Sequence, residues 1–554
     1  MLAVLLTWCY IFVAGFNLGF AVNKILRLQL TDFVVSIFLG LFSVTLVAGF
    51  WAVFDRIHLE FHVFLLLLNL AIFWYWKNEI ISSYHAFYLQ IINLPRQTKL
   101  MLVVTSILLL AVSAAPANFT DNETYYIQTI KWLNTYGFVK GLANLHIFFG
   151  QTSGWHILQS AFNLSFLDLG LNRINGFCVL MATIHGSLKM VTFKQAGLLP
   201  LVLVCLFPFI GVPSPDLAVC VIAFICFCYF LEHFDDCSLE AWTVILLLAV
   251  FIVLIKVTAL PILLLPLVLL FRRFGKVSRH ILVGCFLAFA TLILFVLKNT
   301  ILTGLPLFPL NYFSSVANLD FAIPKPIYQL LFNDARLYDF VMPKSDYYKA
   351  AVMEVFIKWL SAPGFSGFFN CFTILLLFTI PIFIGKCLNK KAYWVLYGLM
   401  IVQLAFLFMT SPQYRFMLPF IFFFSTFIIA RFVPKNLILK LQQLSVLIFI
   451  VLLISPAKNA FSNRQIQFEN DSIEPSNLII PHSNSNLSSD FQAAVSGNLY
   501  YNSPQNHYFW VTGDGKLPCV NTTQLQYFQR KTGYRPQQRT SNLKDGFYSQ
   551  KISP

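Results

Sequence analysis

The sequence predicts an all-α membrane protein with about fourteen transmembrane helices. The 554-residue chain is 58% hydrophobic and only 11% charged, and it contains 60 Phe. Its mean hydropathy is +0.72, which exceeds what the core of a soluble protein requires. The apolar residues are gathered in runs of about 15 to 22 residues, close to the length that crosses a bilayer as a helix.

The apolar runs follow one another with short polar connections between most of them. The Lys and Arg residues gather in alternate connections, so the net charge of +15 is better explained by membrane orientation than by nucleic-acid binding. Strict alternation over fourteen runs places the N-terminus and the C-terminal tail outside. The first run has no basic start and no small-residue cleavage site, which favours a retained helix over a signal peptide. The runs are 1–22, 33–53, 61–76, 101–115, 174–190, 197–211, 216–231, 241–256, 258–271, 280–298, 368–385, 392–410, 414–430 and 437–455.

Three units are expected along the chain. Residues 1–100 form an N-terminal block of three membrane helices, and residues 101–455 form a transmembrane core with two long outer loops, 116–173 and 299–367. Residues 456–554 form an exported polar tail, rich in Asn, Ser and Gln. The alternation of side chains around Gly513-Asp514-Gly515 predicts a small β-containing tail, with a partly disordered tail as the alternative.

Amphipathic patterns in the outer loops predict helices that lie in the membrane interface. In the first loop, apolar residues recur at helical spacing from Tyr126 to Leu133, opposite polar residues from Gln128 to Asn134. A second interfacial piece is expected between Trp155 and Leu169. In the second loop, a third is expected at residues 350–360, after the charged stretch from Asp334 to Lys349.

Carboxylates at the ends of membrane runs are the first candidates for chemistry. Asp121 and Glu123 follow the fourth run, where a carboxylate can act as a general base, a metal ligand or a cation site. The competing interpretation, of about equal weight, is that Thr120 and Glu123 form a capping box and Asp121 occupies the first helical turn. Asp216 begins the seventh run after Pro215, where capping is again an alternative. Asp121 and Asp216 are expected at the same depth, where two acids can hold a divalent metal or divide base and orienting roles.

Cations near the outer interface are the second set of candidates. Lys256 separates two short apolar runs, a place where a broken helix opens polar backbone toward a cavity. Arg415 begins the thirteenth run, and Lys298 ends the tenth. Snorkelling to the interface explains each cation alone, whereas a phosphate is the natural partner of several together.

Other chemistry has weak support in the sequence. His146 and His156 lie in the first outer loop, but no metal-binding His spacing occurs, and a structural role is favoured for both. The sequence contains no Walker A segment, Rossmann glycine pattern or GxSxG segment, which argues against soluble nucleotide chemistry. All but one of the 11 Cys lie in or beside apolar runs, so they predict no disulfide framework.

The acid at DNETYY, the following amphipathic helix, the broken Lys-bearing helix and the late Arg-aromatic pair together resemble the C-type glycosyltransferase superfamily (GT-C), which includes the aminoarabinose and protein mannosyl transferases. The resemblance extends from about Met101 to the end of the chain, and the first three helices are additional to the GT-C core. DNETYYIQTIKWLNTYGFVKGLANLH, SPD, TGLPLFPLNYF, LPC and KDGF are also similar to segments of a family of uncharacterised bacterial membrane proteins.

The resemblance implies transfer of a sugar, with inversion, from a polyprenyl-phosphate carrier to a glycan, lipid or protein acceptor on the outer side of the bacterial inner membrane. It implies that Asp121, or Glu123 two residues away, is the acid that acts as base, and that Asp216 is the second acid. Lys256 and Arg415, joined by Lys298, are then the cations that hold the lipid phosphate. A divalent metal on Asp121 and Asp216 is left open, and no nucleic-acid partner is expected. The first loop lacks the Lys-Pro-Pro segment of some relatives, so their donor and acceptor preferences do not transfer.

A transporter or flippase of lipid-linked saccharide is the alternative in a different class, because the same charges can line a pathway. A non-catalytic scaffold for envelope assembly is a third hypothesis. It predicts that Asp121, Asp216, Lys256 and Arg415 lie around separate pockets, whereas the enzyme requires them to share one.

Overall fold

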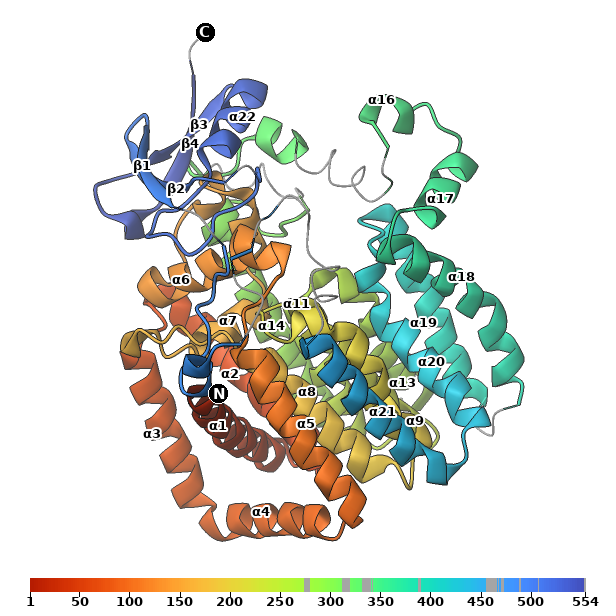
Figure 1. Cartoon of the computed structure of the whole chain (residues 1–554). Coiled ribbons are helices and arrows are strands. Elements are labelled where there is room, and N and C mark those ends of the chain that lie inside the picture. The colour runs from red at the N-terminus through yellow and green to blue at the C-terminus, as the bar shows by residue number, and fades with distance from the viewer. Residues whose placement is uncertain are drawn as a thin grey trace.

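A computed structural model of the chain describes residues 1–273, 279–310, 319–330, 340, 342–386, 390–454, 466, 468–469, 473–487, 490–506 and 508–552. It is mostly helical, with a small β-containing tail at one end (Figure 1). Within these ranges, eight helices are long and apolar enough to cross a membrane. Many large apolar side chains on the outside of the helical body are exposed, such as Leu67, Phe286 and Phe378. This is the surface expected of a protein whose helices face lipid.

Each predicted apolar run is helical. Judged by length and composition, however, fewer than fourteen of the described helices can cross a membrane alone. The eight span-length helices are α1 (Leu2–Leu26), α2 (Phe33–Phe54), α5 (Arg96–Ala114), α11 (Pro215–His233), α14 (Arg279–Thr303), α18 (Phe365–Ile384), α19 (Lys390–Met409) and α21 (Lys435–Ile454). The remaining runs form shorter helices or helix pairs: α3 (Leu59–Tyr75), α8 (Ile174–Lys189), α9 (Lys194–Gly197) with α10 (Leu199–Leu203) and η5 (Val204–Phe209), α12 (Leu239–Ile255), η6 (Val257–Leu263) with α13 (Leu264–Arg273), and η7 (Tyr414–Phe416) with α20 (Leu418–Phe432).

The N-terminal block contains one helix that the sequence did not predict. After α3, the chain turns by 93° into α4 (Lys77–Ile92), and the pair counts as a ninth span if it is taken as one bent helix. Lys24 at the end of α1 forms an ion pair with Glu79 of α4. The helix therefore lies across the end of the block opposite the tail (Figure 1).

The basic connections gather at one end of the helical body, as the charge pattern predicts. Lys194 donates a hydrogen bond to the carbonyl of Val433 at 3.1 Å, and Lys435 donates to the carbonyl of Val191 at 3.0 Å. At the other end, the amide of Ala3 donates to the carbonyl of Ile479 at 3.0 Å. The start of α1 and the tail therefore share a face, which we call the tail face.

The first outer loop is packed under the tail. It contains η1 (Asn122–Tyr126), a short π-helix, followed by α6 (Ile127–Tyr136), η2 (Leu142–Asn144), η3 (Ile147–Gln151), α7 (Gly154–Ala161) and η4 (Ser165–Leu167). The helices at α6 and α7 were predicted, but the interfacial position of α6 was wrong. Gln128, on its polar side, is fully buried and donates to the carbonyls of Gly513 and Gly515 at 3.1 and 2.9 Å. The polar face of α6 therefore binds the tail rather than lipid headgroups.

In the second outer loop, described residues 325–330 are helical, and the loop also contains α16 (Lys344–Tyr347) and α17 (Val352–Leu360). The helix predicted at residues 350–360 is confirmed as α17, which leaves Val352, Met353 and Ile357 exposed. The part of the predicted charged stretch at residues 334–339 lies outside the described residues.

The described part of the tail is folded around two small antiparallel sheets. One is the hairpin of β1 (Phe491–Ser496) and β2 (Leu499–Pro504), and the other pairs β3 (Tyr534–Gln538) with β4 (Phe547–Lys551), with α22 (Thr522–Thr532) between the hairpins. Gly513 has a φ of +61° and lies in a turn, as predicted. The segments beside that turn are not strands, because their backbone binds Glu123 and Gln128 of the first outer loop instead.

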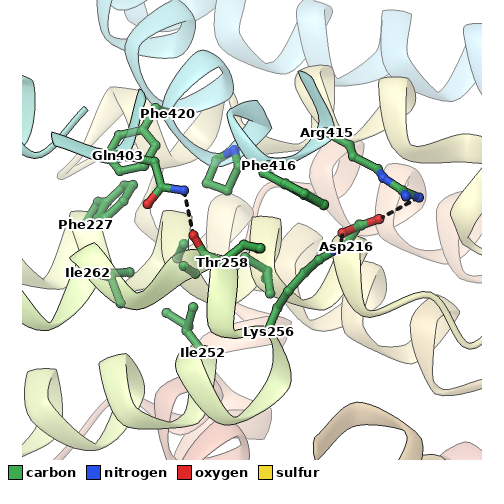
Figure 2. A pocket seen from close by; sticks show the side chains of 14 residues that line it. Asp216, Phe227, Ile252, Lys256, Thr258, Ile262, Gln403, Arg415, Phe416 and Phe420 are labelled. Atoms are coloured by element: carbon green, nitrogen blue, oxygen red, sulfur yellow. Dashed lines mark hydrogen bonds and ion pairs between the residues drawn. The ribbon is translucent and has the colours of Figure 1, made fainter. Parts of the chain in front are cut away.

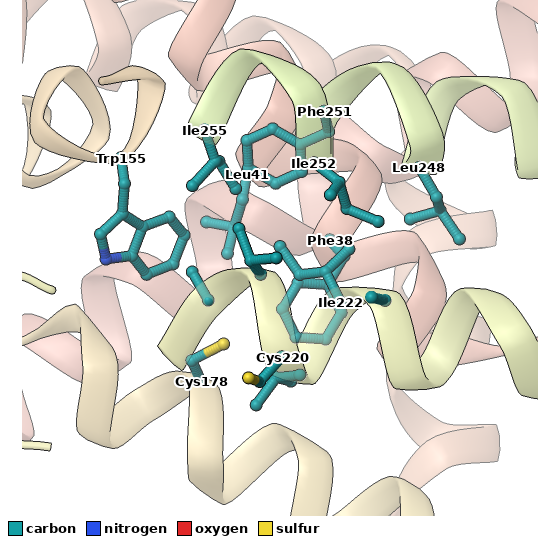
Figure 3. Packing of buried hydrophobic residues seen from close by; sticks show 14 of the residues in the cluster. Phe38, Leu41, Trp155, Cys178, Cys220, Ile222, Leu248, Phe251, Ile252 and Ile255 are labelled. Carbon is teal, nitrogen blue, oxygen red and sulfur yellow. The ribbon is translucent and has the colours of Figure 1, made fainter. Parts of the chain in front are cut away.

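A packed apolar core fixes the helices that lead to the site. Figure 3 shows side chains from α2, α8, α11 and α12 in contact, among them Phe38, Cys220 and Ile252. Trp155 of α7 inserts at the end of this core beside Ile255. Close packing of this kind holds the ends of α11 and α12 at the tail face in a defined position.

Candidate functional site

Four charged side chains from distant parts of the chain meet at the tail face. Nη1 of Arg415 lies 2.7 Å from Oδ2 of Asp121 and 3.4 Å from Oδ2 of Asp216. Nζ of Lys256 forms an ion pair with Oδ1 of Asp216. We call these four residues the ion cluster; Figure 2 shows three of them. It joins both candidate acids and two of the three candidate cations into one chain of contacts, Asp121 to Arg415 to Asp216 to Lys256.

The local structure explains how each member reaches the cluster. Asp216 follows Pro215 in the first turn of α11, and Lys256 terminates α12, which packs against α11. Arg415 lies in η7, the short turn before α20, where Oε1 of Gln413 accepts a hydrogen bond from its Nε at 2.6 Å. Asp121 immediately precedes the π-helix η1. The four positions are therefore fixed by helix ends, where side chains leave the packed body.

The predicted break at Lys256 is present. The chain passes from α12 into the 3₁₀-helix η6, which contains Pro261. The carbonyl of Thr258 accepts a hydrogen bond at 2.9 Å from the buried amide of Gln403 in α19 (Figure 2). Nζ of Lys256 also lies 4.0 Å from the centre of the Phe416 ring, a cation–π contact. Gln403 was not predicted. The aromatic residues beside Arg415 were noted in the sequence, but no cation–π contact with Lys256 was predicted for Phe416.

Asp121 is a member of the cluster, and it also lies in the first turn of the helix that begins at Thr120, as the competing interpretation predicted. Its side chain makes no capping hydrogen bond. Oδ2 accepts from Arg415 and, at 3.4 Å, from the hydroxyl of Tyr126, which the amphipathic pattern predicted only as an apolar position. Oδ1 has no hydrogen-bond partner within the described ranges, and the side chain is 24% exposed. One oxygen of this carboxylate is therefore free to accept a proton.

Glu123 has a different environment, although only one residue separates it from Asp121. Its carboxylate is fully buried and accepts hydrogen bonds from Ser485 Oγ at 2.6 Å, Asn486 N at 3.1 Å and Asn122 Nδ2 at 3.1 Å. The predicted capping box is therefore wrong, because the side chain reaches the tail instead of Thr120. Glu123 holds the tail on the outer loop and is not in contact with the ion cluster.

Burial raises the pKa of Glu123 to about 7 from its ordinary value of 4.5, although its hydrogen bonds oppose the shift. A folded-state pKa above the unfolded one favours folding at low pH, and this contribution is lost as pH rises from about 4.5 to about 7. We expect the apparent melting temperature in detergent to fall over that range, through a loss of at most about 3 kcal/mol. The Glu123→Gln variant should lack this part of the decrease. If the melting temperatures of wild type and Glu123→Gln fall in parallel as pH rises, the decrease does not come from Glu123.

Lys298 does not join the ion cluster. Its Nζ donates to the carbonyl of Thr152 at 2.6 Å, and the side chain is 4% exposed. Among the described residues, Lys298 therefore has no hydrogen bond or ion pair with Asp121, Asp216, Lys256 or Arg415. His146 and His156 are also buried, and burial lowers the pKa of each to about 3, so both rings are neutral at neutral pH.

A narrow pocket opens beside the cluster between α11, η6, α19 and α20 (Figure 2). Asp216, Lys256 and Arg415 line its polar end. Its other walls are apolar and include Phe227, Ile262 and Phe420. The free volume is about 20 Å³, room for one water molecule. The pocket thus combines a charged end at the tail face with an apolar wall between the helices, and a larger ligand needs its walls to separate.

The acids do not fit the metal site that the sequence left open. The guanidinium of Arg415 lies between Asp121 and Asp216 and pairs with both. Within the described ranges, no group of three or more His, Cys, Asp or Glu side chains is placed to hold a metal ion. A divalent cation at this position would have to displace Arg415.

The fold and the site define a class of protein: a helical membrane protein with a charged cluster and an amphipathic pocket at one face of its helical body.

The chain belongs to the family described as a domain of unknown function, DUF8201, whose model matches residues 1–422. The matched region contains all four residues of the ion cluster and stops before the tail. No curated protein matches the chain.

Proposed function

We propose that this protein is a GT-C-type glycosyltransferase of the bacterial inner membrane, with the tail face on the outer side. It transfers a sugar from a polyprenyl-phosphate carrier to a glycan, lipid or protein acceptor, with inversion. The observation that carries the proposal is the convergence of Asp121, Asp216, Lys256 and Arg415 on one cluster beside an amphipathic pocket. The scaffold hypothesis instead predicts that these four residues lie around separate pockets, and their contacts with one another favour the enzyme over it.

The free oxygen of Asp121 supplies the base that this reaction needs. Oδ1 takes the proton of the acceptor hydroxyl as the hydroxyl oxygen forms a bond to the anomeric carbon. The bond from the anomeric carbon to the carrier phosphate breaks on the opposite side, and the phosphate leaves with the electron pair. Tyr126 and Arg415 bind Oδ2 of Asp121 and hold the carboxylate in position.

The cations of the cluster are matched to the departing phosphate. Lys256 and Arg415 are balanced by Asp216 and Asp121 in the structure, so the cluster is close to neutral. Negative charge that develops on the leaving phosphate is stabilised by these two fixed cations, which are already oriented by their acid partners. When the walls of the pocket separate, the apolar side with Phe227, Ile262 and Phe420 suits the first isoprene units of the carrier.

A flippase of lipid-linked saccharide uses similar charges, and a chemical assay separates it from a transferase. We would delete the gene, extract the lipids of the deletion strain, and add purified wild-type protein in detergent together with an envelope fraction as acceptor. We expect polyprenyl-phosphate sugar to accumulate in the deletion strain and to be converted into polyprenyl phosphate by the protein.

In detergent there is no membrane across which a lipid can be moved, and a flippase makes or breaks no covalent bond. A flippase therefore leaves the lipid chemically unchanged in this assay. If correctly folded protein leaves the amount of lipid-linked sugar unchanged, the transferase hypothesis is rejected. Loss of the lipid-linked sugar without appearance of a glycosylated acceptor would indicate a hydrolase instead.

A further inference from the structure

A second cavity lies at the end of the helical body opposite the tail face. It is situated where α1 ends and where α12 and α14 begin, and its free volume is about 70 Å³. Because α1 starts at the tail face and is 25 residues long, its last turn is far from the ion cluster. The residues that line the cavity are Ile25, Leu26, Arg27, Thr243, His280 and Val283.

Arg27 is the permanent cation of this cavity. Its side chain is exposed, and its guanidinium has no hydrogen bond or ion pair within the described ranges, whereas Lys24 one turn earlier is paired with Glu79. The backbone of Arg27 is left-handed, with a φ of +53°, which is uncommon for a residue other than Gly. The side chain of Asn23 fixes this turn, because it binds both the N–H and the carbonyl of Leu30, at 3.1 and 2.8 Å. Arg27 is thus held at the cavity by a defined turn, and its guanidinium can bind an anion.

His280 is the second polar group that can donate to a ligand. It lies in the first turn of α14, where the helix dipole favours a negative charge. Its Nε2 is 3.8 Å from Oε1 of Glu240, too far for a hydrogen bond, and Glu240 does not line the cavity. The hydroxyl of Thr243 already donates to the carbonyl of Leu239 at 2.8 Å. The donors of the cavity are therefore Arg27 and His280.

Apolar side chains on the outside of the helical body adjoin this polar site. Ile25, which lines the cavity, is exposed, and so are Leu282 and Phe286 on the first turns of α14. Phe289 continues the same exposed surface along α14 toward the tail face. A ligand in the cavity therefore meets a cation at the end of the helices and apolar side chains along them. This is the arrangement that suits a phospholipid, with its headgroup at Arg27 and its acyl chains beside α14.

We propose that Arg27 and His280 bind the phosphate of an anionic phospholipid. A guanidinium donates two parallel hydrogen bonds to a phosphate group, and basic pockets between membrane helices suit anionic headgroups. A zwitterionic phospholipid carries an additional ammonium group, and the six lining residues include no acid to pair with it. The cavity should therefore prefer an anionic headgroup. This lipid site is separate from the ion cluster and does not depend on the sugar transfer proposed above.

Native mass spectrometry of the purified full chain in detergent tests the site with dioctanoyl phosphatidylglycerol and dioctanoyl phosphatidylcholine. Wild-type protein should bind phosphatidylglycerol more tightly than phosphatidylcholine. Arg27→Gln should weaken phosphatidylglycerol binding about tenfold, as expected for the loss of a charge-assisted contact, and should abolish the preference. Val283→Phe fills the cavity without changing any charge, and it should also weaken binding. Arg96→Gln removes an exposed arginine at the start of α5 and should leave binding and preference unchanged.

Three results would overturn the lipid site. The first is equal binding of the two lipids by wild-type protein, and the second is unchanged phosphatidylglycerol binding in both Arg27→Gln and Val283→Phe. The third is equal weakening in Arg27→Gln and Arg96→Gln, which would assign the effect to the basic surface as a whole. Glycerophosphoglycerol, the same headgroup without acyl chains, should bind much more weakly than the lipid. If it binds as tightly, the cavity takes a water-soluble phosphate ester and the lipid proposal is rejected.

Discussion

Replacing Asp121 by Asn is expected to reduce sugar transfer roughly 10²- to 10⁴-fold, the range for loss of a positioned general base. Asn keeps the size of the side chain and an oxygen that can accept from Tyr126 and Arg415, but it does not accept the proton of the acceptor hydroxyl. We therefore expect the turnover number to fall while binding of farnesyl phosphate changes little. The measurement is conversion of the lipid-linked sugar by purified variant and wild-type protein in the same detergent.

Glu123→Gln is the matched control for this prediction. Both substitutions remove one carboxylate from the same short segment, but Glu123 is buried against the tail and does not contact the cluster. We expect its transfer rate at pH 7 to stay close to that of wild type. Full activity of Asp121→Asn would show that Asp121 is structural. Loss of activity in Glu123→Gln alone would make Glu123 the working acid.

Lys256→Met is expected to lower the free energy of unfolding by about 3 kcal/mol, the lower end of the cost of breaking a buried ion pair. The side chain of Asp216 is 1% exposed, and removal of Lys256 leaves its Oδ1 without a partner. Arg415 remains 3.4 Å from Oδ2, which limits the loss. The apparent melting temperature in detergent measures this change.

The double variant Asp216→Asn with Lys256→Met distinguishes the ion pair from simple packing. It removes both charges and leaves Arg415 paired with Asp121, so most of the lost stability should return. Sugar transfer should stay low in the double variant, because the cation for the leaving phosphate is still absent. A double variant as unstable as Lys256→Met would indicate that packing of the lysine stem on Phe416 causes the loss.

Hydrophobic patterning predicted the helical body and the residues of the ion cluster. The apolar runs, the break at Lys256 and the gathering of basic connections at one end all follow from local sequence, since each depends on neighbours within one helix or loop. The convergence of Asp121 with Arg415 was expected from topology and resemblance, and their contact is present at 2.7 Å. The GT-C resemblance itself stays a prediction.

The features that sequence analysis missed depend on partners far away in the chain. The interfacial position of α6 was wrong because its polar residues bind carbonyls almost four hundred residues later. The capping box at Thr120 was wrong because Glu123 finds donors at Ser485 and Asn486. Amphipathic periodicity identifies a polar face but does not say whether lipid headgroups or another part of the protein cover it.

The hydrogen bonds between the first outer loop and the tail impose an order on the biosynthesis of the site. Arg173 is buried and donates hydrogen bonds to the carbonyls of His482 and Ser483 at 2.9 and 3.3 Å. Glu123 accepts hydrogen bonds from Ser485 and Asn486, which follow closely in the tail. A ribosome makes the chain from its N-terminus, at about 5 to 20 residues per second. Asp121, Asp216, Lys256 and Arg415 are thus all synthesised before the partners of Glu123 and Arg173 exist. The loop that carries Asp121 therefore reaches its final support only when residues 482–486 and 513–515 have been made and moved to the tail face, so the site is completed after all four members of its ion cluster have been synthesised.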